Sequence, residues 1–169
     1  SLLGRPLVPA PLPEARRLAL EADLAKAEAA LADAEARPTP VDQRGVADAL
    51  IWVGRRQGYL GRYRAAIATF SRGVGRFPGD ARFLRHRGHR HLTVRELALA
   101  EADLASAATL VQAQPDEVEP DGQPNARNIP TSTLQSNIRY HLALAYFLTG
   151  QYRRALPIWE EDATRATNV

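Results

Sequence analysis

Small and apolar residues recur along this chain of 169 residues at intervals of 34. The matching pairs are Leu50 and Leu84, Gly54 and Gly88, Ala66 and Ala100, Phe70 and Leu104, and Gly73 and Ala107. A third copy lies 89 residues after the first, where Gly61, Tyr63, Ala66 and Phe70 correspond to Gly150, Tyr152, Ala155 and Trp159. That offset is one period of 34 plus a step of 55, so 21 extra residues precede the third copy. A fixed period of this length predicts stacked units, each of which buries its apolar face against its neighbours.

Proline clusters divide the chain into segments, and helical spacing dominates between them. Apolar residues recur at intervals of three and four, as in Leu20, Leu24, Ala27 and Leu31, and no stretch alternates between apolar and polar residues. The pattern therefore predicts an all-α fold. We expect an extended proline-rich N-terminus over 1–13, a helix over 14–37 that packs on the next helix, repeat units over 47–80, 81–114 and 136–169, and an acidic proline-rich loop over 115–135.

Two segments resemble a known repeat. The sequence LGRYRAAI at 60–67, followed by FPGD at 77–80, resembles the second half of a tetratricopeptide repeat, and TGQYRRAL at 149–156 resembles it again. With Leu142, Ala143 and Tyr146 in the preceding helix, the resemblance covers residues 47–166. It implies a right-handed superhelix of three helix pairs, here preceded by one N-terminal packing helix. In this family the first helix of each pair lines a concave wall that binds peptides or proteins, and no catalytic residues come with the fold.

The small residues of the period have a physical interpretation. A larger side chain at the crossing of two antiparallel helices would force the helices apart. We therefore expect small residues of the two helices in each pair to face each other: Gly54 and Ala66, Gly88 and Ala100, and Ala143 and Ala155.

Several positions depart from the family pattern. In the second copy Arg87 stands where leucine is usual, Arg95 replaces the turn glycine, and no proline closes the repeat at Gln112, so this copy is degenerate. Pro157 falls inside the second helix of the third copy, where the loss of a hydrogen bond predicts a kink or an early end. No polar solvating helix follows this copy, so we expect further repeats, a partner or a second copy of the chain to cover that face.

The repeat phase places four residues of each first helix on the concave wall. They are Asp48, Ile51, Arg55 and Tyr59 in the first copy, Arg82, Arg85, His89 and Leu92 in the second, and Asn137, Tyr140, Leu144 and Phe147 in the third. Because arginine binds carboxylates in a bidentate manner, this groove suits an extended segment with carboxylates near one end and a large apolar side chain near the other. The predicted peptide-binding residues are Arg55, Arg82, Arg85, His89, Asn137 and Tyr140.

The proline-rich loop has the opposite charge to the repeats before it. Residues 41–114 carry 12 arginines against 6 acids, whereas residues 115–136 carry 1 arginine against 4 acids. Two interpretations follow. The segment DEVEPD at 116–121 folds over the basic groove as an internal pseudo-ligand, or the loop is a solvated insertion.

Three other kinds of function compete with peptide binding. His86 and His89 share a helical face, but the arginines around them repel a divalent cation and no carboxylate lies within 85–91, so no metal site is predicted. The basic and aromatic stretch from Arg55 to Arg90 is also typical of a nucleic-acid-binding surface, which we rank below protein because Tyr63 and Phe70 occupy core positions. The main alternative is a structural array whose exposed end mediates self-association, which predicts a homo-oligomer.

Composition removes further chemistries. The chain has no cysteine, which excludes thiolate metal sites and cysteine nucleophiles. It contains no phosphate loop, nucleophile elbow or dinucleotide-binding turn, so we expect neither a cofactor nor an enzymatic activity. No apolar run reaches the roughly 18 residues needed to span a membrane.

Two counts bear on the origin of the chain. Lys26 is the single lysine among 22 basic residues, and together with the high alanine content this predicts a GC-rich bacterial genome. Methionine is absent, even at position 1, which predicts a processed chain or an excised piece of a longer one. We expect an exported or periplasmic protein whose signal peptide has been removed, with a cytoplasmic protein as the alternative.

Overall fold

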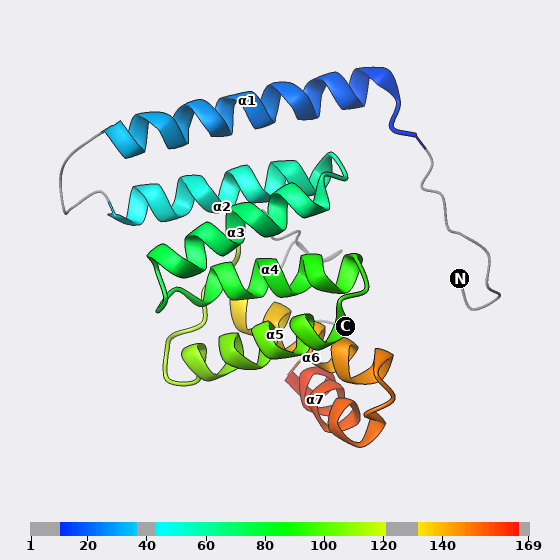
Figure 1. The fold of residues 1–169 in the computed structure, drawn as a ribbon. Coiled ribbons are helices and arrows are strands. Elements are labelled where there is room, and N and C mark those ends of the chain that lie inside the picture. Colours follow the sequence, from blue (N-terminus) through cyan, green and yellow to red (C-terminus); the bar gives the residue numbers. More distant parts are fainter. Residues whose placement is uncertain (1–10, 37–42, 121–131, 166–169) are drawn as a thin grey trace.

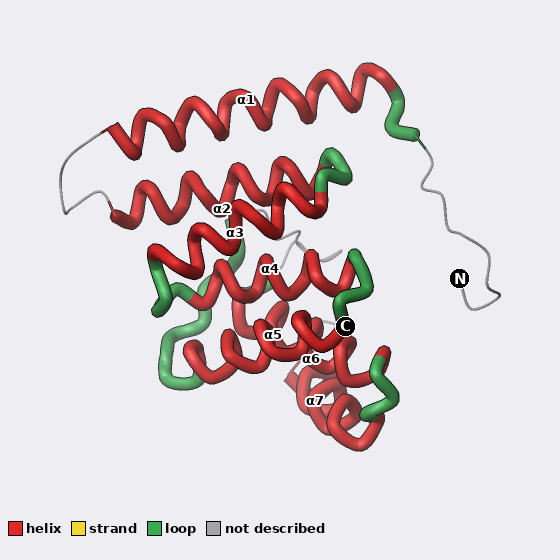
Figure 2. Tube along the Cα trace, in the orientation of Figure 1, coloured by secondary structure: helices red, strands yellow, loops and turns green. Residues whose placement is uncertain are grey.

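The computed structural model describes residues 11–36, 43–120 and 132–165, and these fold into seven α-helices (Figures 1 and 2). The helices are α1 (Glu14–Ala36), α2 (Gln43–Tyr59), α3 (Tyr63–Arg76), α4 (Ala81–Thr93), α5 (Leu97–Val111), α6 (Leu134–Leu148) and α7 (Tyr152–Arg165). The β-type pairing in this part of the chain is one isolated bridge between Val118 and Thr133. The predicted all-α fold is confirmed. Residues 1–10 of the predicted N-terminus and 121–131 of the predicted loop lie outside the described residues.

The helices form a stack in which each one packs on the next along the chain (Figure 1). The loop between α5 and α6 is longer than the other described connections, yet α5 and α6 still pack on each other. In addition, α4 contacts both α2 and α6. Helices α2, α4 and α6 therefore lie next to one another and form one wall of the stack.

The N-terminal helix covers one end of the stack. Leu24 and Leu31 of α1 are buried in the same core cluster as Leu50 of α2 and Phe70 of α3. The apolar seam read from the sequence thus packs on the next helix, as predicted. Acidic residues of α1 meet arginines of the helices beneath it.

The close approach expected at the small residues is present, but their neighbours differ from the prediction. A β-carbon on Gly54 would collide with the ring of Phe70, and one on Gly88 would lie 2.8 Å from Cγ of Leu104. Ala66 and Ala100 are fully buried, yet the atoms closest to the two glycines belong to the residue one helical turn later. The glycines thus accommodate a large side chain of the second helix instead of facing an alanine. The free space at a glycine is filled in a core packed to crystalline density.

The turns within the helix pairs share one unusual backbone conformation. Gly61, Arg95 and Gly150 each lie in the turn between the two helices of a pair, and their φ angles are +73°, +64° and +76°. Glycine adopts this left-handed region freely, whereas an L-residue with a β-carbon is strained there by about 1 kcal/mol. Arg95 therefore keeps the glycine geometry, although the second copy departs from the family pattern at this position.

Of the two outcomes predicted for Pro157, a kink or an early end of the helix, the early end is not observed. Helix α7 continues through Pro157 to Arg165, so the helix does not end early. The described helices include none that is both long enough and apolar enough to cross a membrane.

Candidate functional site

A cavity of about 420 Å³ opens on the wall between α2 and α4. Its lining includes Arg55 and Tyr59 of α2, Arg85, His89 and Arg90 of α4, and Glu119 and Ser132 from the connection to α6. A second cavity of about 190 Å³ adjoins it, and both are lined by Arg55, His86 and Glu119. We call this pair of cavities the basic groove, because arginines of both helices lie along it.

The six residues predicted to bind a peptide do not all lie in the basic groove. Arg55, Arg85 and His89 line the larger cavity, and Arg82 lines the smaller one. Asn137 and Tyr140 lie on α6 outside both cavities. The structure therefore brings together the predicted residues of α2 and α4, whereas those of α6 do not line the groove, although Asn137 donates to the Ser132 hydroxyl at its edge.

Arg82 is already engaged by carboxylates of its own protein. Its guanidinium donates to Asp48 at 2.6 Å and to Asp80 at 2.6 Å, and hydrogen bonding to Asp80 is the main reason why its pKa is raised. Asp80 also caps the N-terminus of α4 by accepting the backbone N–H of Arg82. The position of Arg82 is thus set by the link between α2 and α4, which leaves its side chain less free to bind a ligand.

Arg85 holds a buried carboxylate. Its Nη2 donates to Oε2 of Glu119 at 2.8 Å, and its Nε lies 2.8 Å from the other oxygen, Oε1. Both side chains are less than 10% exposed. Burial lowers the pKa of Arg85 to about 10 and raises the pKa of Glu119, although each charge opposes the shift of the other. In a buried ion pair of this kind, the attraction between the two charges is largely cancelled by the cost of removing them from water. The pair therefore adds little net stability.

The segment that delivers Glu119 is extended and is anchored on the N-terminus of α6. The backbone N–H of Glu119 donates to the carbonyl of Ser132, and the N–H of Leu134 donates to the carbonyl of Glu117. The carboxylate of Asp116 accepts the Thr133 hydroxyl at 2.6 Å and the backbone N–H of Gln135 at 3.0 Å. These bonds hold residues 116–119 beside α6 and direct one side chain into the groove.

Arg90, like Arg44 in the smaller cavity, is a cation of the groove that sequence reasoning missed. Its guanidinium donates to the Nδ1 of His89 at 2.9 Å and lies over the ring of Tyr63, and within the described residues no carboxylate pairs with it. Burial is the main cause that lowers its pKa. The repeat phase predicted that His89 lies on the wall. Arg90 is the next residue along the chain, and allowing an error of one residue in the prediction would have included it.

Three histidines lie beside these arginines. The rings of His89 and His141 have centroids 4.2 Å apart, and His86 stacks on Phe70 in the core. Burial, followed by the charges of nearby arginines, lowers the pKa of His89 to about 2 and places that of His86 well below its usual value. Burial likewise lowers the pKa of His141 to about 4, against the opposing effect of its 2.6 Å hydrogen bond to the carbonyl of Asn137. All three are therefore neutral at pH 7.

Among the residues that the structure describes, no group of three or more histidine, aspartate or glutamate side chains is placed to hold a metal ion. His89 and His86 instead accept hydrogen bonds from Arg90 and Arg85. Sequence reasoning did not identify His141, although its place beside Tyr140 on α6 was the available signal.

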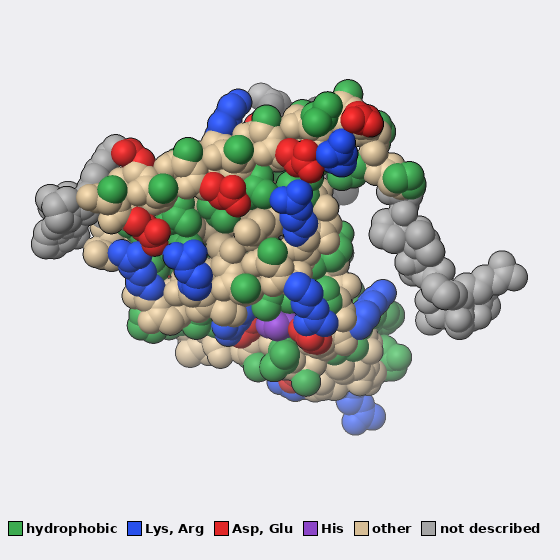
Figure 3. Space-filling view, turned by 45° about the horizontal axis from the view of Figure 1, so that its top comes forward, with side chains coloured by type: hydrophobic (Ala, Val, Ile, Leu, Met, Phe, Trp, Pro, Cys, Tyr) green, Lys and Arg blue, Asp and Glu red, His purple; other side chains and the backbone are tan. Residues whose placement is uncertain are grey.

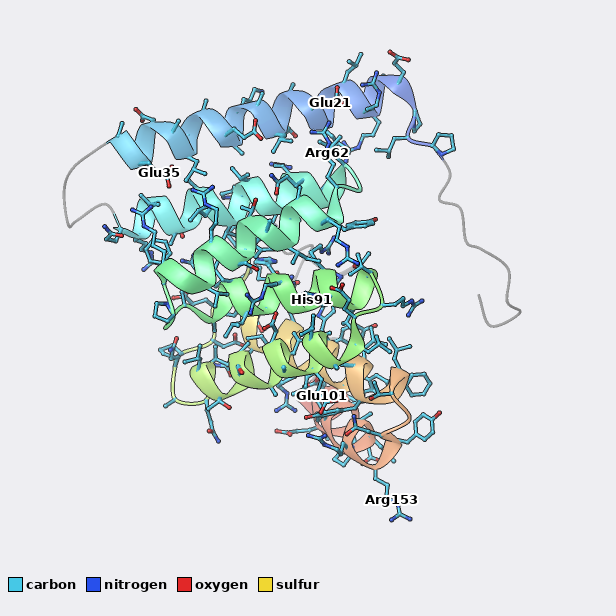
Figure 4. All side chains as sticks on the ribbon, in the orientation of Figure 1. Glu21, Glu35, Arg62, His91, Glu101 and Arg153 are labelled. Carbon is cyan, nitrogen blue, oxygen red and sulfur yellow. The ribbon has the colours of Figure 1, made fainter. Side chains whose placement is uncertain are left out.

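The arginines on the outer face are paired with acids of α1. Arg62 lies 3.3 Å from Glu21, and both Arg72 and Arg76 donate to Glu35 (Figure 4). In Figure 3 the acidic side chains over α1 lie next to basic ones, so neither charge forms a continuous patch on this face. The arginines of the basic stretch therefore do not form one surface. Arg62, Arg72 and Arg76 are paired with acids of α1 on the outer face, whereas others line the groove.

The last helix has an apolar surface. Phe147, Tyr152 and Leu156 are about half exposed, and with Ala155 and Trp159 they line a cavity of about 360 Å³. We call this the α7 apolar surface. Arg153, which points away from the body in Figure 4, lies at its edge.

Comparison with protein-family models finds no match to this chain, and comparison with curated proteins finds no similar sequence.

Proposed function

We propose that this protein is a non-catalytic scaffold of the tetratricopeptide type that binds acidic, extended protein segments in the basic groove. Three observations support the architecture. Helices pack in succession, α4 contacts both α2 and α6, and a left-handed residue recurs at 61, 95 and 150. An array with this geometry is expected to be a right-handed superhelix whose concave wall carries the groove.

The observation that carries the functional proposal is the imbalance of charge in the larger cavity. Among the described residues, three guanidinium groups line it, those of Arg55, Arg85 and Arg90, and a single carboxylate, that of Glu119, lies among them. Burial, and after it the charge of Arg55, lowers the pKa of both Arg85 and Arg90, so a partly buried site with this excess of positive charge favours an anionic ligand. Arginine prefers carboxylates in bidentate geometry, which an acidic peptide supplies.

Nucleic acid is the less favoured anion. Phosphate binding uses several arginines along a continuous exposed surface, whereas Arg62, Arg72 and Arg76 are paired with acids of α1. The groove that remains is short and lies between two helices, which suits one or two carboxylates rather than a phosphate backbone.

The proposal is tested by fluorescence polarisation. The probe is a labelled peptide composed of glutamate, leucine, glycine and serine residues. We expect the peptide to bind and the affinity to fall at least tenfold in the double variant Arg55→Gln/Arg90→Gln. Arg72→Gln, which removes a cation of the outer face, is the matched control and should leave binding unchanged. Equal losses in both variants, or no loss in either, would show that the groove does not bind the peptide.

A second candidate function is self-association through the α7 apolar surface. Its occupant would be a second copy of this chain, because the surface is formed by aromatic and aliphatic side chains that can pack against an identical set. Light scattering during size-exclusion chromatography tests this candidate: Leu156→Asp should convert a dimer to a monomer, and a wild-type monomer at high concentration would exclude it.

A further inference from the structure

The segment that enters the basic groove buries its charged residue and exposes its apolar one. Between 112 and 120 Glu119 is the one buried residue, whereas Val118 beside it is 53% exposed. A loop that serves only to connect two helices gains most by burying the valine and leaving the carboxylate in water. The opposite arrangement indicates that Arg85 recognises the glutamate.

The backbone of this segment also has the form of a bound peptide. Residues 117–119 are extended, and they pair with 132–134 through the two backbone hydrogen bonds described above. Val118 and Pro120 line the smaller cavity on either side of Glu119. A short extended peptide that is held by backbone bonds and by one buried anchor is a common mode of recognition.

We infer that residues 117–120 are a tethered stand-in for the ligand of the groove, and that the partner is an extended peptide with a glutamate between an apolar residue and a proline. This inference rests on the proposed function and names its ligand. The partner would place its glutamate on Arg85 after displacing Glu119, while the excess cation Arg90 would remain for a second acidic group.

Displacement is feasible because the covalent tether and the anchoring bonds on α6 help to keep Glu119 at Arg85, in addition to the ion pair itself. A tethered group competes with an effective concentration set by its linker, typically in the millimolar range, so a free ligand of ordinary affinity can replace it. The Arg85–Glu119 pair itself adds little net stability after desolvation. The wild-type groove is therefore expected to bind a free peptide of this type weakly, and a chain without Glu119 is expected to bind it more tightly.

The test uses an acetylated, amidated peptide with the sequence of residues 115–120, PDEVEP, labelled for fluorescence polarisation. We expect Glu119→Ala to bind it at least tenfold more tightly than the wild type does. A peptide with glutamine in place of the second glutamate should lose that gain, and so should the double variant Arg85→Gln/Glu119→Ala.

Because Glu119→Ala leaves Arg85 without its partner, a second variant guards against a loss of folding. Asp116→Ala removes the carboxylate that anchors the segment on α6 and leaves the Arg85–Glu119 pair in place. It should also increase affinity for the peptide, by less than Glu119→Ala does. Circular dichroism verifies that each variant is folded.

The outcomes separate this inference from the proposed function. If the wild type and both variants bind PDEVEP equally, the groove still binds acidic peptides and the tethered stand-in is refuted. If neither the wild type nor a folded variant binds any acidic peptide, both proposals fail.

Discussion

Gly73 of α3 lies against the ring of Phe83 of α4, with no room for a β-carbon between them. Both residues are buried at the junction of the first two helix pairs. Gly73→Ala should lower the free energy of unfolding by about 1–3 kcal/mol, because overpacking at this contact outweighs the better helix propensity of alanine, which is about 1 kcal/mol. Urea denaturation followed by circular dichroism measures the change.

Gly75 is the matched control for that substitution. It lies two residues further along α3, and a β-carbon there would meet nothing within 4 Å. Gly75→Ala should be neutral or should stabilise by up to about 1 kcal/mol. Equal destabilisation by the two alanines would contradict the close contact with Phe83.

Arg87 and Asp103 form a bidentate pair between α4 and α5, with both N–O distances at 2.7 Å. Asp103→Ala should destabilise the fold by about 2–4 kcal/mol, because it leaves a partly buried guanidinium without its partner. The double variant Arg87→Leu/Asp103→Ala should recover much of that loss, since it removes the unpaired charge. A double-mutant cycle by chemical denaturation measures the coupling.

A surface pair provides the comparison for this cycle. Arg64 and Glu96 also form an ion pair, but the Arg64 side chain is 68% exposed. Arg64→Ala should change the free energy of unfolding by less than about 1 kcal/mol. A loss as large as that of Asp103→Ala would mean that burial does not set the strength of these pairs.

The neutral histidines make stability depend on pH. His89 and His141 have pKa values of about 2 and about 4 in the folded chain, and the usual value near 6.5 applies when the chain unfolds. Their contribution is complete above pH 6.5 and is lost as pH falls, so the unfolding free energy should drop by about 2 kcal/mol per histidine at pH 5.

Denaturation midpoints at pH 7.5 and pH 5 measure that dependence. The charged groups facing the two rings include Arg85 and Arg90, which stay protonated throughout this range. His141→Phe should reduce the loss of unfolding free energy between the two pH values by the contribution of one histidine. A midpoint that does not change between the two pH values would contradict the burial of neutral rings.

Pro157 interrupts the hydrogen bonds of α7 without ending the helix. Pro157→Ala should stabilise the protein by about 1–3 kcal/mol, because it restores a backbone N–H to the helix and removes the clash of the ring with the preceding turn. Thermal unfolding followed at 222 nm measures the gain. A lower melting temperature would indicate that the ring of Pro157 contributes contacts that alanine cannot replace.

Sequence periodicity predicted the helices because it acts locally. The 34-residue spacing and the proline clusters placed α2–α5 and the pair α6–α7, and the seam of α1 indicated its packing face. The neighbours of each side chain were harder to predict, because they depend on how two helices rotate against each other. Gly54 therefore meets Phe70 and not Ala66.

In the candidate site, too, the helix on which a residue lies was predictable, whereas its neighbours were not. Helical phase placed Arg55, Arg85 and His89 on one wall, but it could not show that Asp48 and Asp80 engage Arg82. Charge counts indicated that the loop and the repeats attract each other. They could not show that Glu119 is the acid that enters the groove, because this depends on how Asp116 anchors the segment at α6. Asn137 and Tyr140 do not line the groove, which helical phase could not predict because it does not determine how α6 is placed against α4.

The two ends of the stack differ in polarity, and this limits any assembly that forms through them. Helix α1 covers one end and exposes charged side chains there, among them Arg16, Lys26 and Glu28, whereas α7 presents exposed aromatic and aliphatic side chains at the other end. A head-to-tail contact would press an apolar surface on a charged one, so a growing filament is disfavoured. Association through α7 would instead join like to like about a twofold axis, and such an assembly closes at two copies.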